Sequence, residues 1–315
     1  MVLIFGTAFV YLLTFNQLTM SKIVKLSAIL LVSTLALVSC RKKENPKQIL
    51  ESIQAAEDNG MIESEFENAK DISDVEANAT PGVQRTTGIR RVLWVLPQDS
   101  ARTSVTVSDS GAYKKIEINF GNTPVVCNDG KYRKGIIVFR VDTGFYKTLN
   151  AKASMTLINY YAGFDKLRMT QYTGKRELIN NGNNASGQPQ FTLTVTNASA
   201  ITPDGKTITW TSNRVITKTK GYTTPLNPWD DEYSVTGTGS GVNRNGEAFT
   251  VNITTPLYKK VKLGCASTFV TGVWTLTLTS SGTTMTLDYD AYGDGACDKV
   301  AKVTINGNER IVYVN

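Results

Sequence analysis

The stretch VWTLTLTSSGTTMTLDY, residues 273–289, decides the fold class of this chain. Apolar residues alternate with threonine in its first half and again in its second half, which is the period-two pattern of half-buried strands. Ser281 and Gly282 separate the halves, and glycine readily adopts the backbone conformations that tight turns need. The stretch therefore predicts two antiparallel strands joined by a hairpin turn.

The same alternation recurs from about residue 90 to the end of the chain. Turn signals interrupt it at short intervals, and no linker divides it. Many short strands between such turns predict one all-β domain over 90–315, either an antiparallel β-sandwich or a barrel-like sheet. Further examples of the pattern are GIIVFRV, FTLTVTNASAITPDGKTITWTSNRV, DEYSVTGTGSGV and AFTVNITTPL.

A different pattern precedes the β region, and it predicts a short helical arm over 49–80. Asn45 followed by Pro46 suits a helix start, because proline fits the first helical position. Asn59-Gly60 offers a stop between two helical patterns. The first contains Ile49, Leu50 and Ile53, and the second contains Ile62, Phe66, Ala69, Ile72 and Val75.

Charge is divided unequally between this arm and the β region. Residues 44–77 hold ten acids and two lysines, a net charge of −8, whereas residues 78–315 hold 27 basic and 17 acidic residues, a net of +10. We expect the arm to dock on the β domain through Ile62, Phe66 and Ile72; a disordered acidic spacer is the alternative. The bases are scattered rather than clustered, so no nucleic-acid partner is expected.

The first 48 residues are predicted to be a targeting signal followed by a tether. Residues 1–39 form the signal region, and the true start is expected at Met20, because Lys22, Lys25 and a short apolar run follow it. Leu-Val-Ser-Cys, ending at Cys40, resembles the bacterial lipobox, which implies cleavage before Cys40 and acylation of its thiol. Residues 40–48 would then be a lipidated tether that binds the protein to a membrane.

Five segments together resemble an uncharacterised family of secreted lipoproteins from Bacteroidetes. The likeness covers about residues 50–315, and it implies an envelope location and an all-β fold but no activity. Members typically read DYGDGTCDN where this chain reads DYDAYGDGACDK, so its turn is three residues longer. The segments are INFGNTPVVCNDGKYRKGIIVF, NYYAGFDKL, TPDGKTITWTSNRV, VTGTGSGVNRNGEAFTVNITTPL and LDYDAYGDGACDKVAKVTINGN.

That phylum's surface-exposed lipoproteins usually carry an acidic tract after the lipidated cysteine. Here the tract is RKKEN, which is basic. The resemblance therefore favours the periplasmic face of the outer membrane over the cell surface. Asp99, Ser100 and Ala101 also resemble the phylum's O-glycosylation motif, with a plain loop as the alternative.

The absence of histidine from the sequence excludes histidine-based catalytic triads and histidine metal sites. The most conspicuous remaining group is Trp229, Asp230, Asp231 and Glu232, a candidate loop for a glycan or protein ligand. We expect a structural or ligand-binding envelope protein that is not an enzyme and has no cofactor. The alternative is a glycoside hydrolase that uses two carboxylates.

A calcium loop is a weaker alternative near the carboxyl end. Asp288 and Asp290 have the alternate spacing of such loops, but Asp294 does not continue it, and no glutamate closes the loop. The neighbouring glycines suit a hairpin turn equally well. We therefore expect no metal here.

Three cysteines remain once Cys40 is assigned to lipid, and an oxidising envelope favours one disulfide among them. Cys265 and Cys297 are equidistant from residue 281, so a hairpin turning there would bring them face to face. Cys127 is the rival partner for Cys297, because both follow a strand and a glycine and precede an aspartate. The spacing favours Cys265–Cys297 and leaves Cys127–Cys297 open.

Overall fold

A computed structural model describes most of the chain after the predicted tether. The described residues are 46–78, 88–90, 92–145, 148–224, 228–261, 269–298 and 300–313. Residues 1–45, which include Cys40 and the predicted signal region, lie outside these ranges, as does Cys265.

One long helix, α1, spans Pro46–Asn78 and contains 33 residues. It begins at Pro46 as predicted, but the predicted stop at Asn59-Gly60 is wrong, because the helix continues through both residues. A glycine inside a helix costs about 1 kcal/mol relative to alanine. Tertiary packing offsets that cost: Ala55 before the glycine and Ile62 after it are both fully buried.

In the described part of the chain, fifteen strands form a single antiparallel sheet, and nearly all neighbours in the sheet are also neighbours in sequence. The all-β prediction is confirmed. The strands, with the short helices α2 (Pro97–Ser100) and η1 (Pro228–Asp230), are β1 Gly88–Arg90, β2 Ser104–Asp109, β3 Tyr113–Asn119, β4 Val125–Val126, β5 Tyr132–Asp142, β6 Lys152–Gly163, β7 Thr170–Asn183, β8 Pro189–Ile201, β9 Thr207–Lys220, β10 Glu232–Val242, β11 Ala248–Lys260, β12 Thr271–Leu278, β13 Thr284–Asp288, β14 Val300–Ile305 and β15 Asn308–Tyr313.

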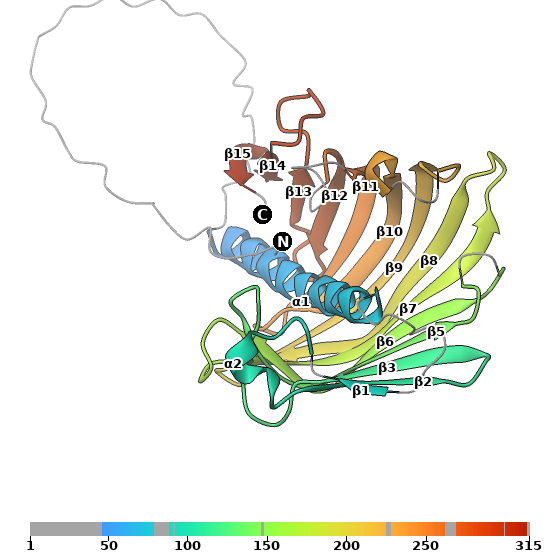
Figure 1. Cartoon of the computed structure of the whole chain (residues 1–315). Coiled ribbons are helices and arrows are strands. Elements are labelled where there is room, and N and C mark those ends of the chain that lie inside the picture. Colours follow the sequence, from blue (N-terminus) through green and yellow to red (C-terminus); the bar gives the residue numbers. More distant parts are fainter. Residues whose placement is uncertain are drawn as a thin grey trace, which may run out of the picture.

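The sheet curves strongly and holds α1 within its concave face (Figure 1). Its strand order runs from β1 to β15 without closing. Of the two predicted architectures, the barrel-like one describes it better, because the strands form one curved sheet rather than two facing sheets. The stretch that predicted the hairpin forms β12 and β13, with Thr277 opposite Thr284 and the turn between them.

Strand register identifies the side chains of the concave face, because directly paired residues point to the same side of a sheet. One row of such pairs crosses twelve strands and includes residues that are buried against α1. The row is Val107, Ile116, Phe139, Met155, Arg176, Val195, Ser212, Gly239, Val251, Leu276, Met285 and Ile305.

The docking of α1 is confirmed for the described residues. Ile62, Phe66 and Ile72 are at most 1% exposed, and they share one hydrophobic core with strands β2 to β9. In contrast, Leu50 and Ile53 of the first helical pattern are 66% and 38% exposed. The second helical pattern therefore forms the docking face. Residues 46–78 form a docked helix, so the alternative of a disordered spacer is wrong for them.

Candidate functional site

The centre of the concave face is built to receive Phe66 of α1. Gly174 of β7 lies beneath the ring: a Cβ atom there would be 3.0 Å from Phe66 Cζ and 2.6 Å from the Cα of Ala198. The ring also packs at 5.8 Å, centroid to centroid, from the indole of Trp210. A glycine at a bulge, where the register shifts between Thr173 and Lys175, thus lets helix and sheet approach closely.

A network of buried charges fixes the same part of α1. Arg133 of β5, which is fully buried, donates two hydrogen bonds of 2.7 and 2.6 Å to Asp129 and one of 2.9 Å to the Tyr160 hydroxyl. Tyr160 in turn donates to Glu65 of α1 at 2.7 Å, and Lys131 pairs with Glu65 at 2.8 Å. Every charge is met by an opposite charge or a hydrogen bond, which is the condition for burying it.

The pKa of Glu65 follows from this network. Burial, the largest influence, acts to raise it, but Lys131, Arg133 and the Tyr160 hydroxyl together hold it below its ordinary value of 4.5. Hydrogen bonds and charge from Arg133 likewise outweigh burial and lower the pKa of Asp129. Both carboxylates are therefore ionised at neutral pH, where they attract the cations around them.

Other acids of α1 on either side of Glu65 reach the sheet and its loops. Asp58 accepts hydrogen bonds of 2.7 Å from the Arg244 backbone and side chain in the β10–β11 turn. Glu76 accepts the backbone N–H groups of Leu93 and Trp94 at 2.7 and 3.0 Å. The unequal charge in the sequence is thus expressed as specific contacts between the acidic helix and a basic face.

Two arginines of the concave face pair with α1 along the side that faces β7 to β9. Arg176 lies 3.3 Å from Glu67, and Arg214 pairs with Glu63. Arg214 belongs to the next row of paired residues on the concave face. It lies opposite Leu193, and Leu193 in turn pairs with Leu178. These pairs mark the boundary at which the contact of α1 with the sheet ends.

Glu67 lies at that boundary, close to other protein groups but still accessible to water. Its side chain is 45% exposed. Desolvation is the largest influence on its pKa and acts to raise it, but Arg176, Lys70, Arg214 and Lys259 together lower it below 4.5.

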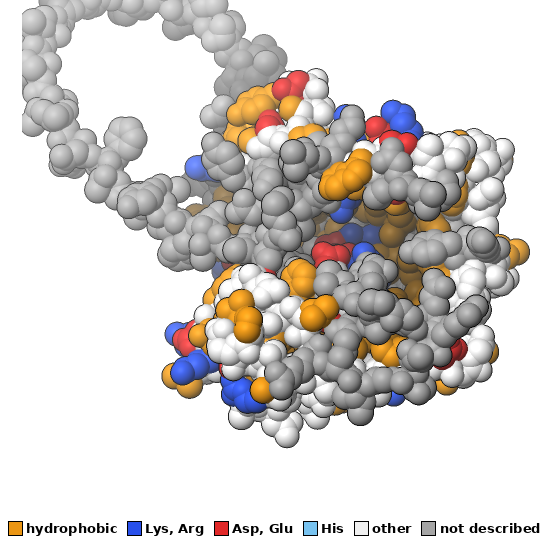
Figure 2. Space-filling view, in the orientation of Figure 1, with side chains coloured by type: hydrophobic (Ala, Val, Ile, Leu, Met, Phe, Trp, Pro, Cys, Tyr) orange, Lys and Arg blue, Asp and Glu red, His pale blue; other side chains and the backbone are white. Residues whose placement is uncertain are grey.

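The concave face continues beyond the reach of α1 as an apolar surface. Phe145, Ala151 and Phe191 form a separate hydrophobic cluster that includes no residue of the helix. Half-buried Leu178 and Ile216 pack against it, together with Val141 and Ala153. Figure 2 shows a hollow in the molecule with hydrophobic side chains inside it and charged groups beside them. We call this hydrophobic cluster and its packed neighbours the apolar floor.

The basic residue Lys259 faces the same hollow. Lys259 is paired in register with Tyr233, and Tyr233 is paired with Lys218. These three residues form the row next to the one that contains Ile216. Within the described part of the chain, no carboxylate lies within 4.0 Å of its ammonium group. Desolvation lowers the pKa of Lys259 below 10.5 and outweighs the opposite effect of Glu67 and Asp71.

The predicted ligand loop lies elsewhere and is largely occupied by internal contacts. Trp229 is 61% exposed, as expected of a surface tryptophan. Asp230 accepts a hydrogen bond from Thr224 at 2.6 Å, Asp231 pairs with Lys218 at 2.7 Å, and Glu232 pairs with Lys220 at 2.9 Å. These carboxylates stabilise the ends of β9 and β10, and Trp229 is the most exposed of the four residues.

The predicted calcium alternative finds no support in the geometry. Asp288, Asp290 and Asp294 each accept backbone N–H groups from residues two to five positions ahead. Such bonds are typical of turn aspartates. No group of three acidic, cysteine or histidine side chains is arranged to hold a metal ion within the ranges that the structure describes.

The cysteines are partly described. Cys127 is a buried free thiol, and Cys297 is disulfide-bonded, so the rival pairing Cys127–Cys297 is wrong. Cys265 and Cys40 lie outside the described residues, and the pairing Cys265–Cys297 stays a prediction. Burial, the largest influence, raises the pKa of Cys127 to about 11, which keeps its thiol protonated and unreactive.

The glycosylation candidate forms a tight local structure. Asp99 accepts the Val126 N–H at 2.8 Å and pairs with Arg102, and Ser100 donates to the Pro97 carbonyl at 2.9 Å. The aspartate therefore has a structural role that explains its presence without glycosylation. Whether Ser100 is modified stays a prediction.

The residues that line the concave face do not form a recognisable motif in the sequence. One signal was present: Arg176 is in phase with Leu178, and Arg214 with Ile216, so each arginine occupies an inward position of an alternating strand. A charged residue at an inward position indicates either an ion pair or a site. Its partner could not be read from the strand itself.

Comparison with known proteins adds no relative. No protein-family model, curated protein or solved structure matches the chain. Among the described residues, no helix is both long enough and apolar enough to cross a membrane.

Proposed function

We propose that this chain is a lipid-anchored protein of the outer membrane, held at the periplasmic face through Cys40, that binds a small ligand with a hydrophobic part in its concave face. One observation carries the ligand-binding role. The described residues of α1 contribute nothing to the apolar floor, and its members Leu178 and Ile216 are only partly buried, whereas the cluster that α1 shares with β2 to β9 is buried.

Two features favour binding over a purely structural role. Half-buried Leu178 and Ile216 leave apolar surface on the concave face, where an apolar ligand would release water. Figure 2 shows hydrophobic side chains inside a hollow of the molecule. The helix that forms one wall is fixed by buried ion pairs, so the site is held open before a ligand arrives. Preformed apolar sites of this kind cost little ordering when they bind.

The arrangement favours binding over glycoside hydrolysis as well. Glu63 and Glu67 are one helical turn apart and face the hollow, as a pair of catalytic acids would need. However, each pairs with an arginine, and cations lower the pKa of Glu67. A general acid needs the opposite shift. Trp229 remains the place where a glycan or protein would contact the surface.

The neutral fluorophore Nile red tests the ligand-binding role. We expect its fluorescence to rise on addition of the full-length chain, and Ile216→Trp, which fills the apolar floor, to remove most of that rise. Ile158→Trp is the matched control, because Ile158 is 43% exposed on a strand that also contributes to the core. Equal fluorescence from all three proteins would contradict the proposal.

A further inference from the structure

We infer that the concave hollow selects an amphipathic anion: a single apolar chain on the floor that includes Ile216 and Leu178, and an anionic headgroup at the ammonium of Lys259. This inference rests on the proposed ligand-binding function and names the class of ligand. It follows from where Lys259, which makes no ion pair with a described residue, lies relative to the apolar floor.

Among the described residues, three cations near the hollow are paired with carboxylates and Lys259 is not. Arg176 and Arg214 pair with Glu67 and Glu63 of α1, and Lys218 pairs with Asp231. Lys259 projects from β11 toward Glu67 and Asp71 but makes no ion pair within the described residues. A cation in crowded surroundings without a partner is unfavourable, so an anion supplied from outside would be stabilised there.

Lys259 and the apolar floor are at a suitable separation for one molecule. Tyr233 of β10 pairs with Lys259 on one side and with β9 on the other. Ile216 of β9 belongs to the row next to this one. Two strand spacings are about 10 Å and the offset of two residues along β9 is about 7 Å, so Ile216 lies about 12 Å from Lys259 along the sheet. An extended chain of about ten carbons attached to a headgroup at Lys259 would span that distance, and Phe191 and Leu178 continue the apolar surface.

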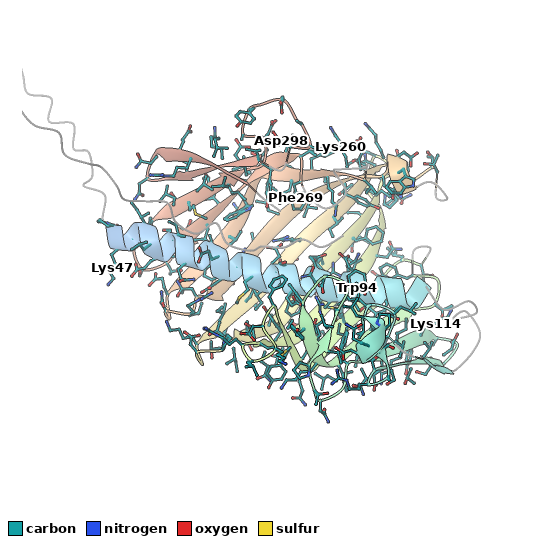
Figure 3. All side chains as sticks on the ribbon, turned by 60° about the vertical axis from the view of Figure 1, so that its left-hand side comes forward. Lys47, Trp94, Lys114, Lys260, Phe269 and Asp298 are labelled. Atoms are coloured by element: carbon teal, nitrogen blue, oxygen red, sulfur yellow. The ribbon has the colours of Figure 1, made fainter. Side chains whose placement is uncertain are left out.

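The opposite face of the same strand provides a control. Lys260 is adjacent to Lys259 in β11 and is paired in register with Glu232 rather than with Tyr233. Successive side chains of a strand point to opposite faces, so Lys260 lies outside the hollow. In Figure 3, Lys260, at the end of β11, lies above α1.

The probes are dansylaminoundecanoic acid and its methyl ester, which share a chain and differ in headgroup charge. The protein is the full-length chain with Cys40→Ala, so that no acyl group attached at that residue competes. We expect the acid to bind about tenfold more tightly than the ester, because a hydrogen bond to a charged group is worth more than one between neutral groups. Lys259→Met should remove that preference, and Lys260→Met should keep it.

The source of the anion is distinguished by competition against the bound acid probe. Displacement by oleate or by lysophosphatidate, with oleyl alcohol much weaker, supports the inference and identifies a carboxylate or a phosphate headgroup. Equal displacement by oleyl alcohol overturns it. The comparison of acid with ester in the unsubstituted chain remains decisive even where Lys259→Met does not fold.

Failure of the inference can be separated from failure of the proposed function. If the ester binds and the acid binds no more tightly, the hollow binds apolar ligands but Lys259 does not select a headgroup. If neither probe binds, the proposed ligand-binding function itself is wrong, and the inference falls with it.

Discussion

The hydroxyl of Tyr160 donates a 2.7 Å hydrogen bond to the carboxylate of Glu65, and this contact joins the centre of β6 to the centre of α1. The two residues are 95 positions apart in sequence. Their contact closes the buried network that includes Arg133, Asp129 and Lys131, and it fixes the helix that forms one wall of the hollow.

Replacing Glu65 by Gln should destabilise the protein strongly. The substitution keeps the shape but leaves Arg133 without part of its counter-charge, and removing one member of a buried ion pair typically costs about 3–5 kcal/mol. Denaturant unfolding would measure the loss. Glu117→Gln is the control: Glu117 pairs with Lys115 at 3.2 Å where both are partly exposed, so a loss below about 1 kcal/mol is expected. Equal losses of unfolding free energy in both variants would show that the buried network stabilises the protein no more than an exposed ion pair does.

Acidification should destabilise the same network. The pKa values of Glu65 and Asp129 are lowered in the folded protein relative to 4.5 and 3.8. Groups with lowered folded pKa values contribute their stability above the unfolded values and lose it as the pH falls through the folded ones. The midpoint temperature of thermal unfolding should therefore decrease as the pH is lowered below about 4.5. Glu65→Gln should show a shallower fall, and an unchanged slope would contradict this assignment.

Gly174→Ala should weaken the docking of α1. The new Cβ would lie 2.6 Å from the Cα of Ala198 and 3.0 Å from Phe66, and the φ of +131° is itself unfavourable for alanine. Gly111→Ala separates the two effects, because Gly111 has a φ of +81° but open space around it. We expect Gly174→Ala to increase the cleavage of α1 by protease and Gly111→Ala to leave it unchanged. Equal cleavage in both variants would show that the close approach of Phe66 is unimportant.

The thiol of Cys127 should react with Ellman's reagent only after denaturation. It is buried, and burial raises its pKa to about 11, so little thiolate exists in the folded protein at pH 8. Peptide mapping under non-reducing conditions should then find Cys297 joined to Cys265. That bond would stabilise the fold by about 3–4 kcal/mol through its loop. A peptide containing Cys127 and Cys297 would contradict both expectations.

Cys40→Ala should release the protein from membranes or leave an unprocessed precursor. The predicted lipobox ends at Cys40, and several acyl chains on one residue give stable anchoring. Labelled palmitate in growing cells would measure the modification, with Cys127→Ala as the control that keeps the label. Equal incorporation into Cys40→Ala would rule out this attachment site.

The local periodicity of the sequence determined the elements of this fold. Threonine and apolar residues alternating around Ser281-Gly282 specified β12 and β13, because period-two patterning requires only neighbouring residues. In the same way, the spacing of Ile62, Phe66 and Ile72 specified the buried face of α1. The break expected at Asn59-Gly60 did not occur, since packing against distant strands outweighs a local preference.

Only the tertiary structure decided which charged residues meet and where the hollow lies. Strict alternation from the inward Leu157 would place Tyr160 on the outer face, but a register shift, with Asn159 at a φ of +47°, turns Tyr160 inward to Glu65. Lys259 and Glu67 likewise face each other only because the sheet curves around α1. Bulges and curvature arise from contacts between residues far apart in sequence, which no local pattern contains.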